Sequence, residues 1–272
     1  MNSLYKALTA AGVVALLVVG CKKESRTTTE TKEISHETLS KIKSLGFGTA
    51  DVRKVTEGYL VEGDIVLTDE NLDNVPQMGI LRVGTSEQYR TTNLVTRLPR
   101  TITVTTSGLT QPYIDGTIQT VTRYNNLNLQ IKFQYVSSGS ADITIVGFNQ
   151  GPSGGYITLG SSVFPTKRGD PYSQVKMNTN QYAYGTNPDP TYVGAVIQHE
   201  IGHCIGFRHT DYMDRSYSCG GAASNEGASN VGAVHIPGTP TGPDANSWML
   251  ACSNGRDRTF NANDKTALNY LY

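Results

Sequence analysis

Residues 199–209 read HEIGHCIGFRH, and this stretch decides how the rest of the chain is interpreted. His199 and His203 are four residues apart, so a helix places both imidazoles on one face, where they can bind a single metal ion. Glu200 lies beside them and can accept a proton from a metal-bound water. The first half of the stretch therefore predicts a helix that carries two metal ligands and a general base.

The second half of the stretch supplies a third ligand. The helix has to end before another histidine can return to the same ion, and Gly206 tolerates the left-handed conformation typical of a helix C-terminus. His209 then completes a zinc site with three histidine ligands and one open position for water. The alternative is an amphipathic helix with surface histidines, but three of the chain's five histidines lie in this one pattern. We therefore expect a zinc hydrolase.

Composition excludes some classes of function. The 272-residue chain has 23 Lys and Arg residues and 23 Asp and Glu residues, so its formal net charge is zero. This balance argues against electrostatic binding of nucleic acid. A charged fraction of only 17%, together with 15 tyrosines, is typical of a β-rich exported protein.

The N-terminus predicts export. Residues 7–19 are almost wholly apolar and follow Lys6, which is typical of a signal peptide and too short for a membrane span. Residues 18–21, VVGC, resemble the bacterial lipobox, in which the cysteine is lipidated after cleavage. A plain signal peptide with a chance cysteine is the alternative. Because Lys22 does not resemble an inner-membrane retention signal, we expect a lipid anchor at Cys21 and a place in the bacterial cell envelope, at the outer membrane or cell surface.

We expect four parts along the chain. They are a signal peptide at 1–20, a flexible tether at 21–34, a small leader at 35–77 that is a candidate propeptide, and a catalytic domain at 78–272. The leader is expected to hold a helix over 35–46 and a strand over 58–67.

Hydrophobic periodicity in the catalytic domain predicts both strands and helices, and hence an α+β fold. Strands are expected at 98–107, 127–136, 141–148, 156–164 and 172–178, and helices at 112–126, 192–206 and 261–272. The residues after the zinc helix are rich in Gly, Ala, Ser and Pro and are expected to be irregular. An extended substrate would pair with a sheet edge, for which the strand at 156–164 is the candidate.

Three cysteines remain after Cys21. In an exported protein they allow one disulfide and one free thiol. A bond between Cys219 and Cys252 would tie the segment after the zinc helix to the segment near Met249. A bond between Cys204 and Cys219 would close a shorter loop, and the sequence leaves both pairings open.

The string HEIGHCIGFRHTD at 199–211 resembles the bacterial HEIGH-type, or dual-action, metallopeptidases. With a methionine downstream, it also resembles the wider metzincin group. The resemblance implies zinc as cofactor, ligands at His199, His203 and His209, a general base at Glu200, and Met249 as the apolar floor under the metal. It also implies a metzincin-like fold with a twisted mixed sheet, a zinc helix and an irregular C-terminal subdomain.

The sequence also departs from a related group, the astacins. Astacins place a tyrosine ligand two residues after the methionine, where this chain has Ala251. They usually follow the third histidine with glutamate, where this chain has Thr210 and then Asp211. Asp211 either orients the site, pairs with a charge elsewhere, or is a solvated carboxylate.

Residues 62–65, EGDI, resemble a characteristic stretch of astacin propeptides in which an aspartate caps the zinc. Asp64 is therefore a candidate latency switch, since a carboxylate can occupy an open zinc position. The alternative is that Gly63 and Asp64 merely mark a turn.

The function expected from these features is that of a zinc-dependent endopeptidase acting on extracellular or periplasmic proteins. It would act as a monomer on protein or peptide substrates, without nucleic acid. One alternative is a zinc amidohydrolase that acts on cell-wall or glycan-linked peptides. Another is a surface binding lipoprotein with a structural zinc, against which Glu200 argues because a structural site needs no base.

Overall fold

The computed structural model describes residues 34–45, 47–49, 51–73, 88–153, 155–223, 233–240 and 242–272. The expected signal peptide, Cys21 and almost all of the tether lie outside the described residues, as does the expected boundary between residues 77 and 78. Residues Ile34–Tyr272 belong to one compact unit. No helix in the described ranges combines the length and apolar character needed to cross a bilayer.

A five-stranded sheet forms the scaffold of the molecule. Its strands are β5 (Arg100–Ser107), β6 (Ile131–Tyr135), β7 (Ile143–Phe148), β8 (Gly160–Ser161) and β9 (Gln174–Asn178). The spatial order is β6-β5-β7-β9-β8, with β8 antiparallel to β9 and the other pairs parallel. The mixed sheet with packed helices confirms the predicted α+β class.

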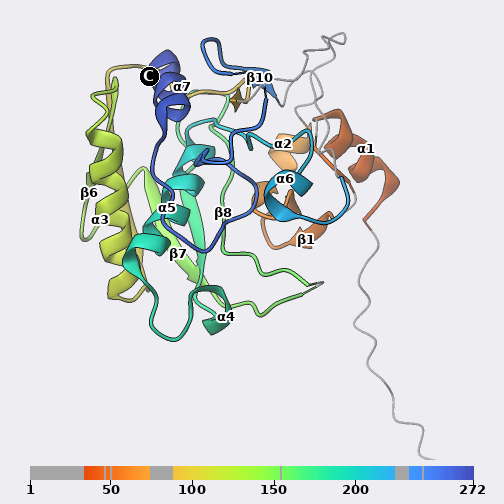
Figure 1. Cartoon of the computed structure of the whole chain (residues 1–272), viewed down its shortest axis with the longest axis horizontal. Helices are drawn as coiled ribbons and strands as arrows, with labels where there is room; N and C mark the ends of the chain where they lie inside the picture. The colour runs from red at the N-terminus through yellow and green to blue at the C-terminus, as the bar shows by residue number, and fades with distance from the viewer. Residues whose placement is uncertain are drawn as a thin grey trace, which may run out of the picture. The chain divides into compact units, whose positions relative to one another are not determined.

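Two long helices, α3 (Gln111–Asn125) and α5 (Pro190–Cys204), lie side by side (Figure 1). Gly116 and Gly194 let them approach closely, because a Cβ on Gly116 would lie 2.9 Å from the backbone nitrogen of Gly194. Thr120 Oγ1 then donates to the carbonyl of Gly194 at 2.8 Å. This contact fixes α5, the predicted zinc helix, relative to the rest of the core.

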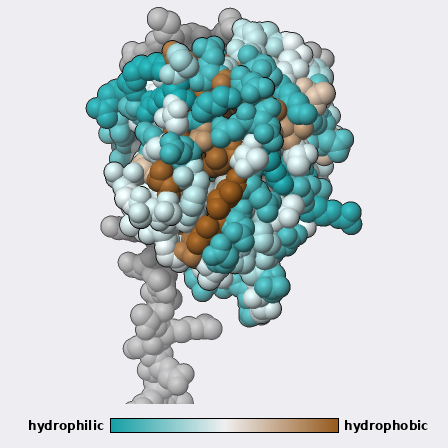
Figure 2. Space-filling view, turned by 90° about the vertical axis from the view of Figure 1, so that its left-hand side faces the viewer, coloured by the Kyte–Doolittle hydropathy of each residue, from teal (hydrophilic) through white to brown (hydrophobic). Residues whose placement is uncertain are grey.

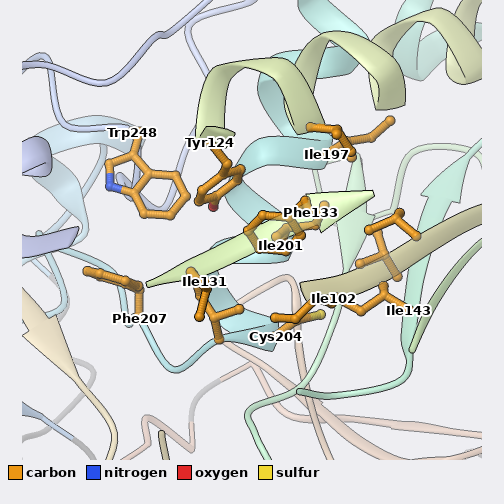
Figure 3. Close-up of a cluster of buried hydrophobic side chains, with 14 of the residues drawn as sticks. Ile102, Tyr124, Ile131, Phe133, Ile143, Ile197, Ile201, Cys204, Phe207 and Trp248 are labelled. Atoms are coloured by element: carbon orange, nitrogen blue, oxygen red, sulfur yellow. The ribbon is translucent and has the colours of Figure 1, made fainter. Parts of the chain in front are cut away.

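The main hydrophobic core fills the space between α5, α3 and the sheet (Figure 3). Ile197 and Ile201 of α5 are fully buried at a spacing of four residues, together with Ile102 and Ile143 from the sheet. Trp248 packs edge-on against Tyr124 and Phe207. The apolar side of α5 therefore meets the sheet, while its histidines are left for a different neighbour.

The leader folds as a helix, a three-stranded sheet and a short helix. These elements are α1 (His36–Ser44), β1 (Arg53–Val55), β2 (Gly58–Val61), β3 (Ile65–Leu67) and α2 (Asp69–Asp73). The prediction of one strand over 58–67 was wrong. Glu62 and Gly63 have φ values of 56° and 91°, so the chain reverses there and β2 pairs with β3 as an antiparallel hairpin. Residues 62–64 are its tip.

The prediction of a strand over 156–164 was also largely wrong, because the ladder is limited to β8. The Asn178 side chain amide donates to the carbonyl of Thr158 at 2.8 Å, and Ser153 pairs with Tyr156 in an isolated bridge. The residues before Gly160 thus make single contacts, and only Gly160 and Ser161 pair with β9 in a regular ladder. The edge of the sheet that reaches the site is therefore short.

The remaining elements are small, apart from the closing helix. They are β4 (Tyr89–Arg90), α4 (Gln181–Tyr184), α6 (Ser216–Cys219), β10 (Val234–His235) and α7 (Ala262–Leu271). Asn261 caps α7, and its side chain and that of Asp264 form a reciprocal capping box. The closing helix predicted at 261–272 is thus present with its expected cap.

Figure 2 shows the face of the molecule on the side of α3 and β6, which is largely hydrophilic and crossed by one narrow hydrophobic stripe. On α3, Ile118 is 43% exposed. Apolar residues exposed singly are normal for a soluble protein. We therefore assign no binding site to this face.

Candidate metal centre

Local sequence explains where α5 begins and ends. Asp189 caps it by accepting from the backbone nitrogen of Thr191 at 2.9 Å, and Pro190 occupies the first turn. The helix ends at Cys204, and Gly206 follows with a φ of 112°. A Cβ on Gly206 would lie 2.7 Å from Leu94 and 2.9 Å from the carbonyl oxygen of Asn93. Glycine is therefore required for the left-handed backbone conformation, which the motif predicted. It is also required because a side chain would collide with Leu94 and Asn93.

The histidines of α5 are held by backbone carbonyls. His199 Nδ1 donates to the carbonyl of Trp248 at 2.9 Å, and His203 Nδ1 donates to that of Phe207 at 2.8 Å. A carbonyl oxygen has no proton to give, so each Nδ1 carries the hydrogen. The lone pair of each ring is then on Nε2, which is the arrangement that a metal ligand needs.

Asp64 from the hairpin tip meets all three histidines. Its Oδ2 lies 3.2 Å from His199 Nε2, 3.9 Å from His203 Nε2 and 3.0 Å from His209 Nε2. One ligand atom from each of these four residues can be chosen so that all lie within 4.8 Å of one another. Ligand atoms of tetrahedral zinc, each about 2.0–2.1 Å from the ion, lie about 3.3–3.4 Å apart. The spacing is thus close to that of a four-ligand zinc site.

The chemistry of this donor set also fits a cation. His203 Nε2 is buried and has no hydrogen-bond partner among the described residues. Burial lowers the pKa of His203 to about 4 despite the nearby Asp64 carboxylate, so its ring is neutral. Burial alone would raise the pKa of Asp64, but the charge of His209 beside it holds that pKa well below its usual range. The lone pair of His203 Nε2 and the carboxylate of Asp64 face the same point, and a bound cation there would stabilise both.

Glu200 is buried beside this cluster. Its Oε2 accepts from Ser162 Oγ at 2.8 Å, and a Cβ on Gly160 would lie only 2.8 Å from its Oε1. Burial, and then the negative charge of Asp64, raises the pKa of Glu200 well above its usual value. Glu200 is therefore a stronger base than an ordinary glutamate.

A cavity of about 670 Å³ opens onto the cluster and is lined in part by Asp64, His199 and Glu200. The leader also pairs with the sheet edge there. Ser162 N donates to the carbonyl of Asp64 at 2.9 Å, and Val66 N donates to the carbonyl of Ser162 at 2.9 Å. The leader thus covers both the histidine cluster and the strand edge beside it.

Comparison with known protein families identifies the chain. Residues 59–272 match the family described as dual-action HEIGH metallo-peptidase. The chain belongs to the dual-action HEIGH metallopeptidase family. It is accordingly a zinc metallopeptidase, and the cluster of three histidines and Asp64 is a group that could hold the metal.

Among solved structures, this HEIGH metallopeptidase is similar to those of myroilysin and of a fish enzyme. One myroilysin structure is 15% identical over 67% of this chain and 96% of that chain, with a TM-score of 0.44. High choriolytic enzyme 1, a hatching enzyme zinc-protease from Oryzias latipes (medaka), is 15% identical over 71% of this chain and 98% of that chain, with a TM-score of 0.37. A search of curated proteins gives no match. The family assignment rests on the sequence match.

Met249 of this peptidase lies directly against the helix of the motif. A Cβ on Gly202 would lie 2.6 Å from Met249 Sδ and 2.4 Å from the Trp248 ring. Met249 is fully buried. Gly202, which lies between His199 and His203 in the sequence, therefore lets Met249 and Trp248 pack closely against α5.

The segment around Met249 is held by two buried carboxylates. Asp264 accepts from Trp248 N at 3.2 Å and from Gln88 Nε2 at 2.7 Å. Asp211 accepts from Ala251 N at 2.9 Å and is 1% exposed. Among the interpretations of Asp211, the solvated carboxylate is therefore excluded.

The structure joins Cys219 and Cys252 in a disulfide, which is one of the two pairings that the sequence left open. Cys204 is the free cysteine of the described residues and is buried. Burial raises the pKa of its thiol strongly, with a further rise from Glu200. Cys204 is thus a core residue of α5.

Sequence reasoning missed several residues of the site. Ser162 and Asp264 are far from the motif in sequence, and no local pattern marks them. Arg208 stands inside the motif at an unspecified position, and Glu62 is the first residue of the EGDI stretch, for which only Asp64 was given a role. Their proximity to the predicted residues was the only available signal.

Proposed function

We propose that this metallopeptidase is a zinc-dependent endopeptidase whose ligands are His199, His203 and His209. The observation that carries the proposal is the convergence of their ring nitrogens on one carboxylate oxygen, beside the buried Glu200. A structural zinc site needs four closed ligands and no base. Here the fourth ligand comes from a hairpin that could withdraw.

Each residue has a defined task in this proposal. Zinc, when bound, polarises a peptide carbonyl and lowers the pKa of an adjacent water to about 7. Glu200 accepts a proton from that water and later donates it to the leaving amine. Ser162 holds Oε2 of Glu200, at 2.8 Å, so that the carboxylate stays aimed into the cavity. His199 and His203 keep their orientation through the carbonyls of Trp248 and Phe207.

An extended substrate would pair with the short edge at β8. Ser162 offers both its N–H and its carbonyl there, and both are bonded to the leader at Asp64 and Val66. Backbone pairing of this kind tolerates many sequences. It supports a substrate that is an internal stretch of polypeptide, which favours an endopeptidase.

The leader, residues 35–77, would keep the enzyme latent until it is displaced. Asp64 occupies the position that water and substrate require, and the same hairpin occupies the strand edge. Met249 would serve as the apolar floor beneath the metal ligands. The catalytic domain would comprise residues 78–272.

The site of action follows from the N-terminal pattern. Residues 1–20 would be removed as a signal peptide, Cys21 would carry the lipid, and residues 21–34 would act as the tether. The enzyme would then stand as a monomer at the outer membrane or cell surface of a bacterium and act on extracellular or periplasmic proteins. The disulfide between Cys219 and Cys252 supports an oxidising compartment.

The decisive experiment measures zinc content and casein hydrolysis on the chain from Lys22 onward, before and after proteolytic removal of the leader, and hydrolysis is expected after its removal. We expect about one zinc per chain and hydrolysis that a chelator abolishes and zinc restores. Glu200→Ala should keep the zinc and lose hydrolysis, whereas the exposed control Glu37→Ala should keep both. Full activity of Glu200→Ala would refute the mechanism. Digestion of purified peptidoglycan but not casein would favour the amidohydrolase. Bound zinc without any hydrolysis, even after the leader has been removed, would favour the binding lipoprotein.

A further inference from the structure

Arg208 is a charged side chain buried next to the metal centre. It is fully buried although it carries a guanidinium group, and it immediately precedes His209. Its Nη2 donates to Glu62 Oε1 at 2.6 Å, and the side chain of Glu62 is itself only 1% exposed. A buried guanidinium is stable when a carboxylate meets it with good geometry.

The leader supplies much of the lining around this arginine. Glu62 comes from the hairpin tip. The centre of the Phe47 ring, from the leader, lies 4.5 Å from Arg208 Cζ. The centre of the Tyr212 ring, from the catalytic part, lies 5.5 Å from the same atom. Displacement of the leader would therefore remove a carboxylate and an aromatic cover together. Tyr212 would stay beside Arg208.

The two carboxylates of the hairpin tip lie beside the two ring nitrogens of one histidine, His209. Asp64 Oδ2 lies 3.0 Å from His209 Nε2, and Glu62 Oε2 lies 3.7 Å from His209 Nδ1. The Arg208 pocket is thus one side chain away from the metal position. An extended peptide that places one residue at the metal could place a neighbouring side chain at Arg208.

The backbone of Glu62 is unfavourable for a residue with a side chain. Its φ of 56° is left-handed, which costs a residue with a Cβ free energy relative to a helical or extended conformation. Glycine would adopt this conformation without that cost. The contact of the Glu62 carboxylate with Arg208 offsets the cost.

We infer that Arg208 forms a carboxylate-binding subsite, which Glu62 fills in this chain and an acidic side chain of a peptide substrate fills once the tip is displaced. The inference deepens the proposed function and rests on it for the identity of the substrate. The favoured substrate is a polypeptide with Glu or Asp close to the cleaved bond. A planar guanidinium suits this role because it can bind both oxygens of a carboxylate.

The subsite can be tested in the full chain without zinc or catalysis. Glu62→Ala removes the carboxymethyl portion of the side chain beside Arg208, and acetate has the size and charge to replace it. In the presence of a chelator, we expect saturating acetate to raise the Tm of Glu62→Ala by about 2–4 °C. Acetamide, which has the same shape and no charge, should not raise it.

A matched variant controls for general effects of acetate. Glu57→Ala removes another leader carboxylate, one that pairs with Lys176 and is 34% exposed. Neither Glu57→Ala nor the wild-type chain should show a rise specific to acetate. An equal response of Glu62→Ala to acetate and acetamide, or no response, would overturn the subsite.

A second experiment tests whether the subsite binds an acidic side chain of the substrate. Wild-type preparations that hydrolyse casein are given amidated peptides in which one Glu is moved stepwise across the sequence, with Gln at the same positions as control. One position near the cleaved bond should favour Glu over Gln by about 10- to 100-fold in kcat/KM. If Glu and Gln are cleaved equally well at every position, the subsite does not bind an acidic side chain of the substrate. If only peptides with a free C-terminal carboxylate are preferred, the subsite binds the end of the chain and the proposed acidic side chain is wrong. If casein is not cleaved, the proposed function fails while the acetate result still decides the subsite.

Discussion

His199 Nδ1 donates to the carbonyl oxygen of Trp248 at 2.9 Å, so the first histidine of the motif is oriented by the residue that precedes Met249. Trp248 is held in turn by Asp264, which accepts from its backbone nitrogen at 3.2 Å. The closing helix α7 therefore helps to aim a metal ligand on α5.

We expect Asp264→Ala to weaken zinc binding about 10- to 100-fold, as loss of an outer partner of a metal ligand does. Competition with a chromogenic chelator measures this directly. Asp244→Ala is the control, because Asp244 contacts the same end of α7 through Asn261 and Asn263 and does not touch Trp248. Unchanged zinc affinity in Asp264→Ala would show that the turn holds its place without this carboxylate.

Asp64→Ala should raise the casein hydrolysis of the unprocessed chain by at least about 10-fold, because a charge-assisted contact worth about 1.5–3 kcal/mol would no longer cover the site. Initial rates before any cleavage of the leader are the measurement. Asp51→Ala also removes an aspartate of the leader, from an exposed position, and should leave the rate unchanged. Equal rates for Asp64→Ala and the wild type would sink the latency proposal.

Gly202→Ala should destabilise the protein by about 1–3 kcal/mol, the usual cost of overpacking a core. The added methyl group would meet the Trp248 ring at 2.4 Å and Met249 Sδ at 2.6 Å. Urea unfolding at neutral pH measures the change. Gly151→Ala places a methyl group in open space, and a comparable loss in that variant would mean that the collision is not the cause.

Removal of the disulfide by Cys219→Ser with Cys252→Ser should cost about 2–5 kcal/mol of unfolding free energy. The bond closes a loop with a sequence separation of 33 residues, and this loop connects α6 to the segment after Met249. Thermal unfolding with and without a reductant gives the test. The wild type should lose a similar amount when reduced, and the double variant should not respond to the reductant.

The stability of the sheet should depend on pH through Asp142. Burial acts to raise the pKa of Asp142, but hydrogen bonds from Thr103 and the charge of Arg100 lower it below its usual 3.8. A lowered folded-state pKa gives stability that is present above about pH 4 and is lost as the pH falls through the folded-state value. Asp142→Asn should therefore be less stable than the wild type at pH 7, and the difference should shrink below about pH 4. A difference that stays constant from pH 7 to pH 2 would contradict this.

The zinc motif could be predicted from sequence because its physics is local. A spacing of four residues fixes two imidazoles on one helix face, and a glycine at position 206 ends the helix wherever that helix lies. Strong periodicity likewise predicted α3, α7 and the central strands. The strands predicted over 58–67 and 156–164 were wrong. The chain reverses at Glu62, and in the second range only Gly160 and Ser161 pair with β9.

By itself, the sequence predicted that His199, Glu200, His203 and His209 belong to one metal-binding unit. A spacing of four places two imidazoles on one helix face, and the glycine at position 206 lets the chain return with the third. Only the tertiary structure decided what surrounds that unit. Asp64 is 145 residues from His209, and Ser162 is 38 residues from Glu200. Such contacts depend on how the leader hairpin and the edge of the sheet pack against α5. These contacts join residues that are far apart in the sequence, so they arise from tertiary packing and not from the local pattern of residues.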